Sequence, residues 1–99
     1  MARKKKTKEL EGSYVLPRSL EIADIGKVYQ EVLKMTANTY KKFVVDAGEV
    51  ALIDTAGIQL IVQLLMVLRS TGCEVSWIND SVQIYQMAAE LGVADQLEA

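Results

Sequence analysis

The sequence predicts an α/β fold, in which a small mixed β-sheet is packed with helices in one domain. Its 99 residues are enough for one compact domain and too few for two. Short apolar runs typical of strands alternate with longer runs of helical period, in the order strand, helix, strand, helix, strand, helix. Because each helix then crosses from one strand to the next, the central strands are expected to run parallel or mixed.

The first part of the chain predicts a strand and then a long helix. Residues 14–17 form an apolar run that proline ends, and Leu10 is a candidate for the first half of a hairpin that turns at residues 12 and 13. Between residues 20 and 35, apolar positions recur at spacings of three and four, while the other face is polar. This periodicity indicates an amphipathic helix. A polar connection follows.

The middle of the chain predicts a buried strand and a central helix. Residues 43–45 are apolar and include two β-branched side chains, as in a strand that is buried on both faces. A turn over residues 46–49 and an extended segment over residues 50–53 lead to Asp54-Thr55-Ala56-Gly57. Residues 58–68 are too long and too apolar for an ordinary strand and indicate a helix.

The last third predicts one more strand and one more helix. Residues 74–78 partly alternate between apolar and polar side chains, which favours a strand, and residues 79–81 offer several N-cap candidates. The helix that follows is expected to end at Gly92. Its expected apolar face comprises Val82, Tyr85, Ala88, Ala89 and Leu91. Residues 93–99 predict a short turn or an edge strand around Leu97.

The tetrapeptide Asp54-Thr55-Ala56-Gly57 lies where an extended segment gives way to the central helix. Aspartate and threonine are favoured there, because their side-chain oxygens accept the free N–H groups of the first helical turn. The same position offers an exposed hydroxyl beside the positive end of a helix, which is a suitable place for a phosphate.

The central helix has more apolar surface than a core alone requires. At about 100° per residue, its polar side chains fall within a stripe roughly 40° wide that must face water. These side chains are Gln59, Gln63 and Ser70, and the core residues opposite them are Ile61, Leu64, Leu65 and Leu68. Val62 and Met66 fall beside the stripe, on the side of Thr55. They are candidates for a partner surface, unless neighbouring helices cover them.

Basic residues are concentrated at the N-terminus. Five of the eleven lysines and arginines lie within the first eight positions, which leaves six basic and thirteen acidic residues in the rest of the chain. We therefore expect a disordered basic tail over residues 1–8 and a folded domain over residues 9–99. Such a tail is either an arm for nucleic acid or anionic lipid, or a solubilising segment. Without aromatic residues, the tail favours the solubilising role, and no nucleic-acid partner is predicted.

Composition excludes several kinds of chemistry. The chain has no histidine, so it cannot build a Ser-His-Asp or Cys-His catalytic unit. No carboxylate or thiol cluster has the spacing of metal ligands, and no glycine-rich phosphate-binding motif occurs. The single thiol, Cys73, is expected to pack as a small apolar residue before a strand. The sequence therefore predicts no catalytic site, no metal and no cofactor.

The apolar segments also predict where in the cell the protein is located. Residues 58–68 form the longest apolar stretch, but two glutamines interrupt it and it is too short to span a bilayer. No apolar segment follows the N-terminal lysines, so no secretory signal is predicted. We expect a cytoplasmic protein that does not insert into the membrane.

The order of elements and the tetrapeptide together resemble the STAS family, named for sulfate transporters and anti-sigma factor antagonists. The similarity covers residues 10–97 and includes Asp-[Ser/Thr]-[Ser/Ala]-Gly at the start of an apolar central helix. Its most specific parts are residues 50–60 and Leu91-Gly92-Val93 after the last helix. The resemblance implies a single STAS-like domain that binds other proteins and is not an enzyme.

The resemblance also implies a site. In stand-alone members, a partner kinase phosphorylates the hydroxyl residue after the aspartate, and the unmodified protein binds its partner through this loop and the central helix. Carried over, Thr55 is the candidate phosphorylation site. The candidate partner-binding residues are Asp54, Thr55, Ala56, Gly57, Gln59, Val62 and Met66. The implied function is partner switching in signal transduction, with a kinase, an anti-sigma factor or a chemotaxis-like sensor as the partner.

The pair Thr55-Ala56 leaves a second function open. Many sporulation and stress-response antagonists have Ser-Ser or Ser-Thr at this place. Thr-Ala-Gly also occurs in STAS proteins of chemotaxis-like systems and in the cytosolic STAS subunit of bacterial lipid-transport ABC complexes, where the threonine is an interface residue. The alternative is therefore a subunit of a phospholipid-transport complex that docks on an ABC ATPase. The sequence does not indicate an oligomeric state.

Overall fold

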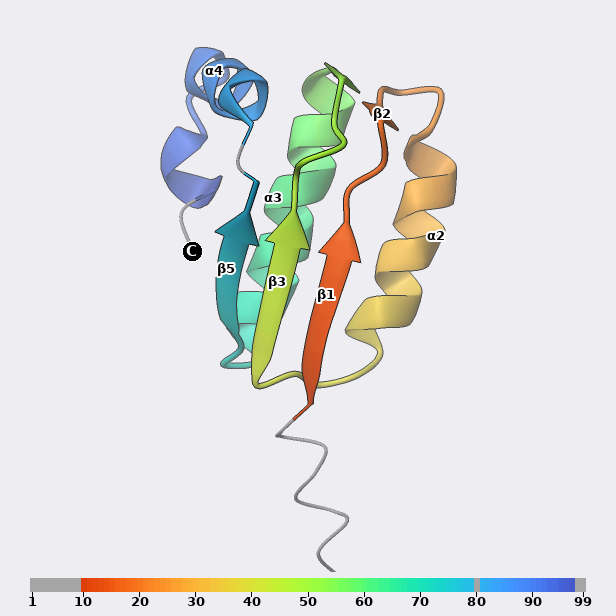
Figure 1. Cartoon of the computed structure of the whole chain (residues 1–99), viewed down its shortest axis with the longest axis vertical. Coiled ribbons are helices and arrows are strands. Elements are labelled where there is room, and N and C mark those ends of the chain that lie inside the picture. Colours follow the sequence, from red (N-terminus) through yellow and green to blue (C-terminus); the bar gives the residue numbers. More distant parts are fainter. Residues whose placement is uncertain (1–9, 80, 98–99) are drawn as a thin grey trace, which may run out of the picture.

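Strands and helices alternate along the chain as an α/β fold requires (Figure 1). The computed structural model describes residues 10–79 and 81–97. The elements are β1 (Glu11–Val15), β2 (Ser19–Leu20), α2 (Ile25–Thr36), β3 (Lys42–Asp46), β4 (Leu52–Ile53), α3 (Thr55–Ser70), β5 (Glu74–Ile78), α4 (Val82–Glu90) and the 3₁₀ helix η2 (Ala94–Leu97). The predicted α/β class is confirmed. The predicted basic tail over residues 1–8 lies outside the described residues.

The strands β1, β3 and β5 form a sheet in that order, and β2 pairs with β4 beyond its end (Figure 1). Every strand pair in the described ranges is parallel, with Glu11 opposite Lys42 and Lys42 opposite Glu74. The chain moves across the three-stranded sheet in one direction, so right-handed crossovers place α2 and α3 on the same face. The carboxyl ends of the strands and the N-terminus of α3 consequently lie at one end of the molecule (Figure 1).

In the part of the chain that the structure describes, helices cover one face of the three-stranded sheet and leave the other uncovered (Figure 1). Phe43, Val45 and Val75 are buried in the core that the sheet shares with the helices. On the other face, Ser76 is exposed and Val44 is half-buried. The expectation that residues 43–45 are buried on both faces is therefore wrong. The reason is topological, because α2 and α3 lie on the same side of the sheet (Figure 1).

The strand β1 is continuous and is not half of a hairpin. Gly12 and Ser13, the predicted turn, lie inside it and pair with Phe43 and Val44 of β3. A Cβ atom on Gly12 would lie only 2.6 Å from the nearest ring carbon of Tyr40. The glycine is thus required by an aromatic ring that packs against the strand, and not by a turn.

The first helix begins later than its periodicity predicts. α2 starts at Ile25, whereas Ser19–Leu20 form β2 and pair with Leu52–Ile53 of β4. Leu20 is buried in this pairing, and Ile22 in the turn before α2 is 72% exposed. In the sequence, Ile22 lies three positions before Ile25 and so continues the helical spacing of α2. Pairing with a distant strand overrides that local pattern.

The central helix α3 divides into buried and exposed faces as predicted. The predicted core residues Ile61, Leu64, Leu65 and Leu68 are all buried. The predicted stripe of Gln59, Gln63 and Ser70 is exposed. Neither α3 nor any other helix in the described part of the chain is long and apolar enough to cross a bilayer.

The buried face of α4 matches the predicted one only in part, since Ala88 is buried and Tyr85 is half-buried as expected. Ser81 caps it by accepting a hydrogen bond from the N–H of Ile84 at 3.3 Å, and its buried residues are Ile84 and Ala88. Val82, expected on the apolar face, is 71% exposed, and Leu91 after the helix is exposed as well. The contacts of α4 with α3 and η2, rather than its own period, select the buried face.

Two small predictions near the C-terminus have different outcomes. Cys73 is buried, and this burial raises the pKa of its thiol, so it is a neutral packing residue as expected. The segment around Leu97 forms the short helix η2 and not an edge strand. The Leu97 side chain is buried, and its carbonyl accepts the indole N–H of Trp77 at 2.8 Å, which fixes η2 against β5.

Candidate functional site

The helix α3 is capped by Asp54 and not by Thr55. Asp54 has extended backbone angles, and its Oδ1 accepts the N–H of Gly57 at 3.2 Å. Thr55 is the first helical residue and its side chain is exposed. Within the described residues, its hydroxyl has no hydrogen-bond partner. Thr55 is therefore not an N-cap, and the fold leaves its hydroxyl free to react or to contact another molecule.

Asp54 also holds the chain segment that precedes α2. Its second carboxylate oxygen, Oδ2, accepts the N–H of Ile22 at 2.9 Å, and its own N–H donates to the carbonyl of Leu20 at 3.4 Å. The hydrogen bond from Ile22, followed by those from Gly57 and neighbouring N–H groups, lowers the pKa of the Asp54 carboxyl. Asp54 is consequently ionised at neutral pH, directly beside Thr55.

Gly57 makes this arrangement sterically possible. It is buried, and a Cβ atom at this position would lie 2.2 Å from the carbonyl oxygen of Leu20. Only glycine lets the first turn of α3 approach β2 so closely. Of the predicted site residues, Gly57 therefore shapes the loop and offers no side chain to a partner. Ala56 is half-buried beside it.

The other predicted residues share one face of α3. Thr55, Gln59, Val62 and Met66 follow the i, i+4, i+7, i+11 spacing that aligns side chains along a helix. Gln59 is exposed, Val62 is half-buried and Met66 is 59% exposed. The expectation that Val62 and Met66 are at least partly exposed is confirmed. A large, flexible apolar side chain such as Met66 suits an adaptable protein contact.

This face of α3 forms one wall of an apolar groove of about 510 Å³. The groove is lined by Ile58, Gln59, Val62, Gln63, Met66, Leu91 and Val93. The last two residues come from the turn between α4 and η2. Gly92, with a φ of 76°, ends α4 and reverses the chain there. The segment Leu91-Gly92-Val93 is recognised in the sequence as a feature of the family that it resembles. Its position beside the central helix follows only from the packing of α4 against α3.

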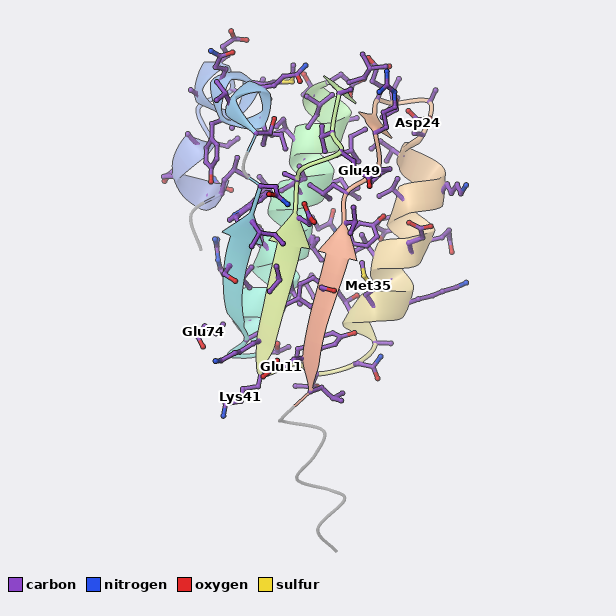
Figure 2. All side chains as sticks on the ribbon, viewed as in Figure 1. Glu11, Asp24, Met35, Lys41, Glu49 and Glu74 are labelled. Carbon is purple, nitrogen blue, oxygen red and sulfur yellow. The ribbon has the colours of Figure 1, made fainter. Side chains whose placement is uncertain are left out.

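Charged side chains lie at both ends of the molecule (Figure 2). Asp24 and Glu49 lie at the end where the strands finish and α3 begins, and Glu11, Lys41 and Glu74 lie at the opposite end. The start of α3 thus shares its end of the molecule with carboxylates besides Asp54.

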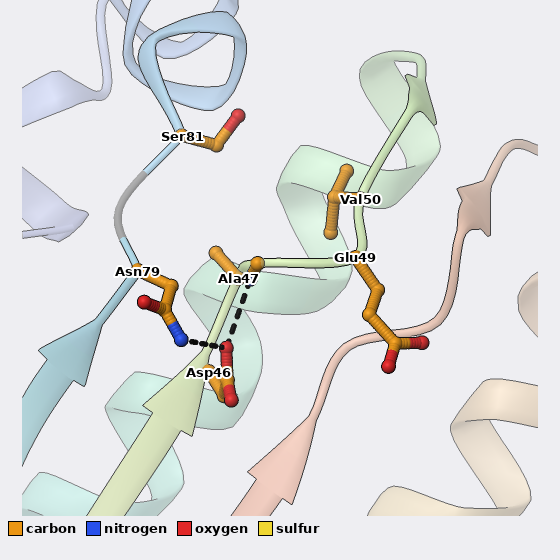
Figure 3. A pocket seen from close by; sticks show the side chains of 7 residues that line it. Asp46, Ala47, Glu49, Val50, Asn79 and Ser81 are labelled. Carbon is orange, nitrogen blue, oxygen red and sulfur yellow. Dashed lines mark hydrogen bonds between the residues drawn. The ribbon is translucent and has the colours of Figure 1, made fainter.

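A second recess, of about 670 Å³, lies at the carboxyl ends of β3 and β5 (Figure 3). Asp46 Oδ1 accepts the N–H of Gly48 at 2.9 Å and the side-chain amide of Asn79 at 3.0 Å. Asn79 has a left-handed φ of 55°. Both hydrogen bonds therefore join residues that line the recess to one another. In the described ranges, neither this recess nor any other place gathers three side chains able to hold a metal ion.

Comparison with known protein families identifies the class of protein. The family model described as "Mlab, STAS domain" matches residues 16–98, a span that includes the tetrapeptide, α3 and the groove. The protein belongs to the STAS family. A search among curated proteins found no match to the chain.

Proposed function

We propose that this STAS protein is a non-enzymatic module that binds one protein partner through Thr55 and the exposed face of α3, and that phosphorylation of Thr55 releases the partner. The observation that carries the proposal is the Thr55 side chain. It is exposed, its hydroxyl makes no hydrogen bond within the described residues, and it begins the face that continues into the apolar groove.

The proposed modification is a phosphoryl transfer. A partner kinase moves the γ-phosphoryl group of ATP to Thr55 Oγ1, the hydroxyl proton is lost and ADP leaves. The phosphate adds about 1.5 to 2 negative charges and three acceptor oxygens. Asp54 beside it is already ionised and already occupies the N–H of Gly57, so the new charge meets an existing negative charge.

This electrostatic change acts on binding rather than on folding. Thr55 points away from the core, so the domain accommodates a phosphate without losing packing. In the unmodified protein, the partner packs against the neutral hydroxyl of Thr55 and against Met66. After phosphorylation, the partner must either bury the phosphate or dissociate. Burying an unpaired charge costs several kcal/mol, on the order of the binding energy of an entire small interface. Release of the partner follows.

The partner of this first candidate is a kinase or anti-sigma factor, or a chemotaxis-like sensor, in the cytoplasm. The module then acts in signal transduction as a partner-switching phosphoprotein, in the manner of an anti-sigma factor antagonist. This choice rests on the Thr55 hydroxyl, which is exposed and makes no hydrogen bond within the described residues, so a kinase could reach it without breaking an interaction of the fold.

The second candidate is a constitutive subunit of a bacterial phospholipid-transport ABC complex, docked on the ATPase. The sequence Thr55-Ala56-Gly57 favours it, because the same three residues occur in such subunits. In this case Thr55 is a packed contact and is never modified. The same face of α3 serves both candidates, and only the role of the hydroxyl differs.

A set of substitutions at Thr55 tests the first candidate. Thr55→Glu should remain folded by circular dichroism and lose the partner. Thr55→Gln is the matched control, since it has nearly the same size without the charge, and it should bind more tightly than Thr55→Glu. Thr55→Ala should bind the partner and resist phosphorylation by the kinase with ATP. If Thr55→Glu binds the partner as tightly as the unmodified protein does, the proposal that phosphorylation of Thr55 releases the partner is wrong.

Affinity purification from the native cell separates the two candidates. Recovery of a kinase or sensor, together with a phosphorylated form of the tryptic peptide that contains Thr55, supports the switch. Recovery of an ATPase with a permease, and only unmodified Thr55, supports the constitutive subunit instead.

A further inference from the structure

The uncovered face of the three-stranded sheet carries an uneven set of charges. In Figure 1 the strands lie in front of α3, so this face is turned toward the reader. Every second residue of each strand contributes to it, because the residues between them pack into the core. The strand register places Glu11, Lys42 and Glu74 side by side at the start of the strands. Asp46, at the other end of β3, adds a third carboxylate, so three carboxylates and one ammonium group give the face a net negative charge.

A recess of about 260 Å³ lies at the row of Glu11, Lys42 and Glu74. Val44 and Ser76 also line it, and their short side chains leave the recess shallow enough for longer side chains to enter. Glu11 and Glu74 lie together at this end of the molecule (Figure 2). Both are exposed, and within the described residues neither carboxylate has a hydrogen bond or an ion pair. The row therefore offers two carboxylates that are free to bind cations.

The chain itself supplies cations at this place. Arg3, Lys4, Lys5, Lys6 and Lys8 precede the sheet, and β1 begins at Glu11, so all five are attached to the edge of the row. At about 3.3 Å per extended residue, Lys8 can lie up to about 10 Å from Glu11 and Arg3 up to about 26 Å. Neighbouring strands are only about 4.8 Å apart, so the whole row is within reach. Such a short tether gives the basic side chains a high effective concentration at the two glutamates.

We propose that residues 3–8 dock on the uncovered sheet face of the same chain, with their basic groups at Glu11 and Glu74. The aliphatic parts of the lysine side chains then lie over Val44, while the ammonium groups stay near the carboxylates and water. The inference does not depend on the proposed function, because α3 lies on the other side of the sheet (Figure 1). The basic segment thus binds the domain and leaves Thr55 and the groove open to a partner.

A second copy of the chain fits this face less well than the basic segment does. Three strands of five residues offer about 240 Å², from a spacing of about 4.8 Å and a rise of about 3.3 Å per residue. A stable interface buries about 800 Å² on each partner. Two copies of a negatively charged face would also repel each other, and the same charge repels nucleic acid and anionic lipid. The tethered basic segment has the opposite charge and needs no large area, because it is already attached.

Paramagnetic NMR on the whole chain measures this docking. A nitroxide on Ala2→Cys reports where the segment lies, and the native Cys73 should take up little label because it is buried and its thiol pKa is raised. We expect the amide signals of Val44 and Ser76 to lose several-fold more intensity than that of Ser70. Ser70 is the matched position, since it ends α3 at the same end of the molecule but on the helical side. Salt at 1 M, where the Debye length is about 3 Å, should abolish the difference.

Charge variants of the labelled chain identify the carboxylates. Glu11→Gln combined with Glu74→Gln should abolish the difference in signal loss between the two faces. Glu90→Gln combined with Asp95→Asn is the matched control, because it removes two exposed charges from α4 and η2, and it should keep the difference. Neither pair should change the melting temperature appreciably, since ion pairs at an exposed surface contribute little to stability.

Three results would overturn the proposal. Equal signal loss at Val44 and Ser70 would show that the segment does not select the uncovered face. An unchanged pattern in the variant without Glu11 and Glu74 carboxylates would show that these groups do not hold it. In a mixture of labelled chain with unlabelled, isotope-enriched chain, signal loss at Val44 in the enriched chain would show that the segment docks on a second copy, whereas full intensity there supports docking within one chain.

Discussion

Asp46 and Asp54 occupy similar local settings in two regions, of which we propose only the second as a binding site. Each lies at or just after the end of a strand, and each accepts one hydrogen bond from a nearby glycine N–H. Each also accepts a second bond from a distant residue, Asn79 or Ile22. These bonds lower the pKa of both carboxyls.

The surroundings of the two carboxylates differ. Asp46 closes a polar loop onto itself, in a recess whose hydrogen bonds are internal (Figure 3). Asp54 caps the central helix beside a free hydroxyl and a groove with exposed apolar side chains. A hydrogen-bonded carboxylate with a lowered pKa therefore does not mark a binding site by itself. We propose that the free hydroxyl and the uncovered apolar surface mark it.

We expect the largest difference in the free energy of unfolding from substitutions of Gly57 and Gly48, the glycines whose N–H groups bind the two carboxylates. Gly57→Ala places a Cβ atom 2.2 Å from the Leu20 carbonyl oxygen, so backbone must move. We expect a loss of about 2–3 kcal/mol, as for overpacking in a tight site. Gly48→Ala meets Asn79 and Asp46 at 3.1 Å on an exposed loop and should change stability by less than about 1 kcal/mol. Urea unfolding measures both, and equal stabilities would show that the start of α3 is not tightly packed on β2.

Acidic substitutions of exposed apolar residues should weaken partner binding at the face of α3 and have no effect on binding near Asp46. Met66→Asp should weaken partner binding by at least about 1–2 kcal/mol, the range for a desolvated contact, and leave the melting temperature nearly unchanged. Ile78→Asp, on an exposed residue at the end of β5, should leave binding unchanged. Val62→Asp should cost some stability as well, since Val62 is half-buried. Equal binding by the Met66 and Ile78 variants would remove α3 from the interface.

Acid titration compares the two carboxyls directly. Because the folded pKa of each is lowered, each stabilises the fold above the pKa of the unfolded chain, and that stabilisation is lost as the pH falls through the folded pKa. Carbon NMR of the carboxyl groups should find both pKa values below the ordinary value. Thr55→Glu should raise the pKa of Asp54, because a like charge favours the protonated form, and should not shift Asp46. A shift of both, or of neither, would contradict the separate environments of the two groups.

Removal of residues 1–8 should have the smallest effect and should not distinguish the two regions. This segment has one apolar residue besides Met1, so its composition allows little burial. We expect nearly the same melting temperature and the same partner affinity. A large fall in melting temperature would show that these residues belong to the fold.

Local pattern alone determined the central helix and the strands around it. The strand Glu74–Ile78 has the predicted bounds, the strand Lys42–Asp46 contains the predicted residues 43–45, and the core and polar faces of α3 follow its 3.6-residue period. These features depend on interactions between neighbours in sequence, which the sequence displays directly. The proposed role of Thr55 came from resemblance to a family, and composition and spacing supplied only a helix start with an exposed hydroxyl.

Contacts between distant residues decided what the local pattern missed. Gly12 resembles a turn residue but lies within a strand because β1 pairs with β3, and residues 19–20 form a strand because β4 pairs with them. Ile22 is joined to the start of α3 by its hydrogen bond to Asp54, and the packing of α4 brings Leu91 to the groove. Periodicity records which side of an element is apolar. It does not record which other element covers that side, because strand pairing and helix docking depend on the free energy of the whole assembled core.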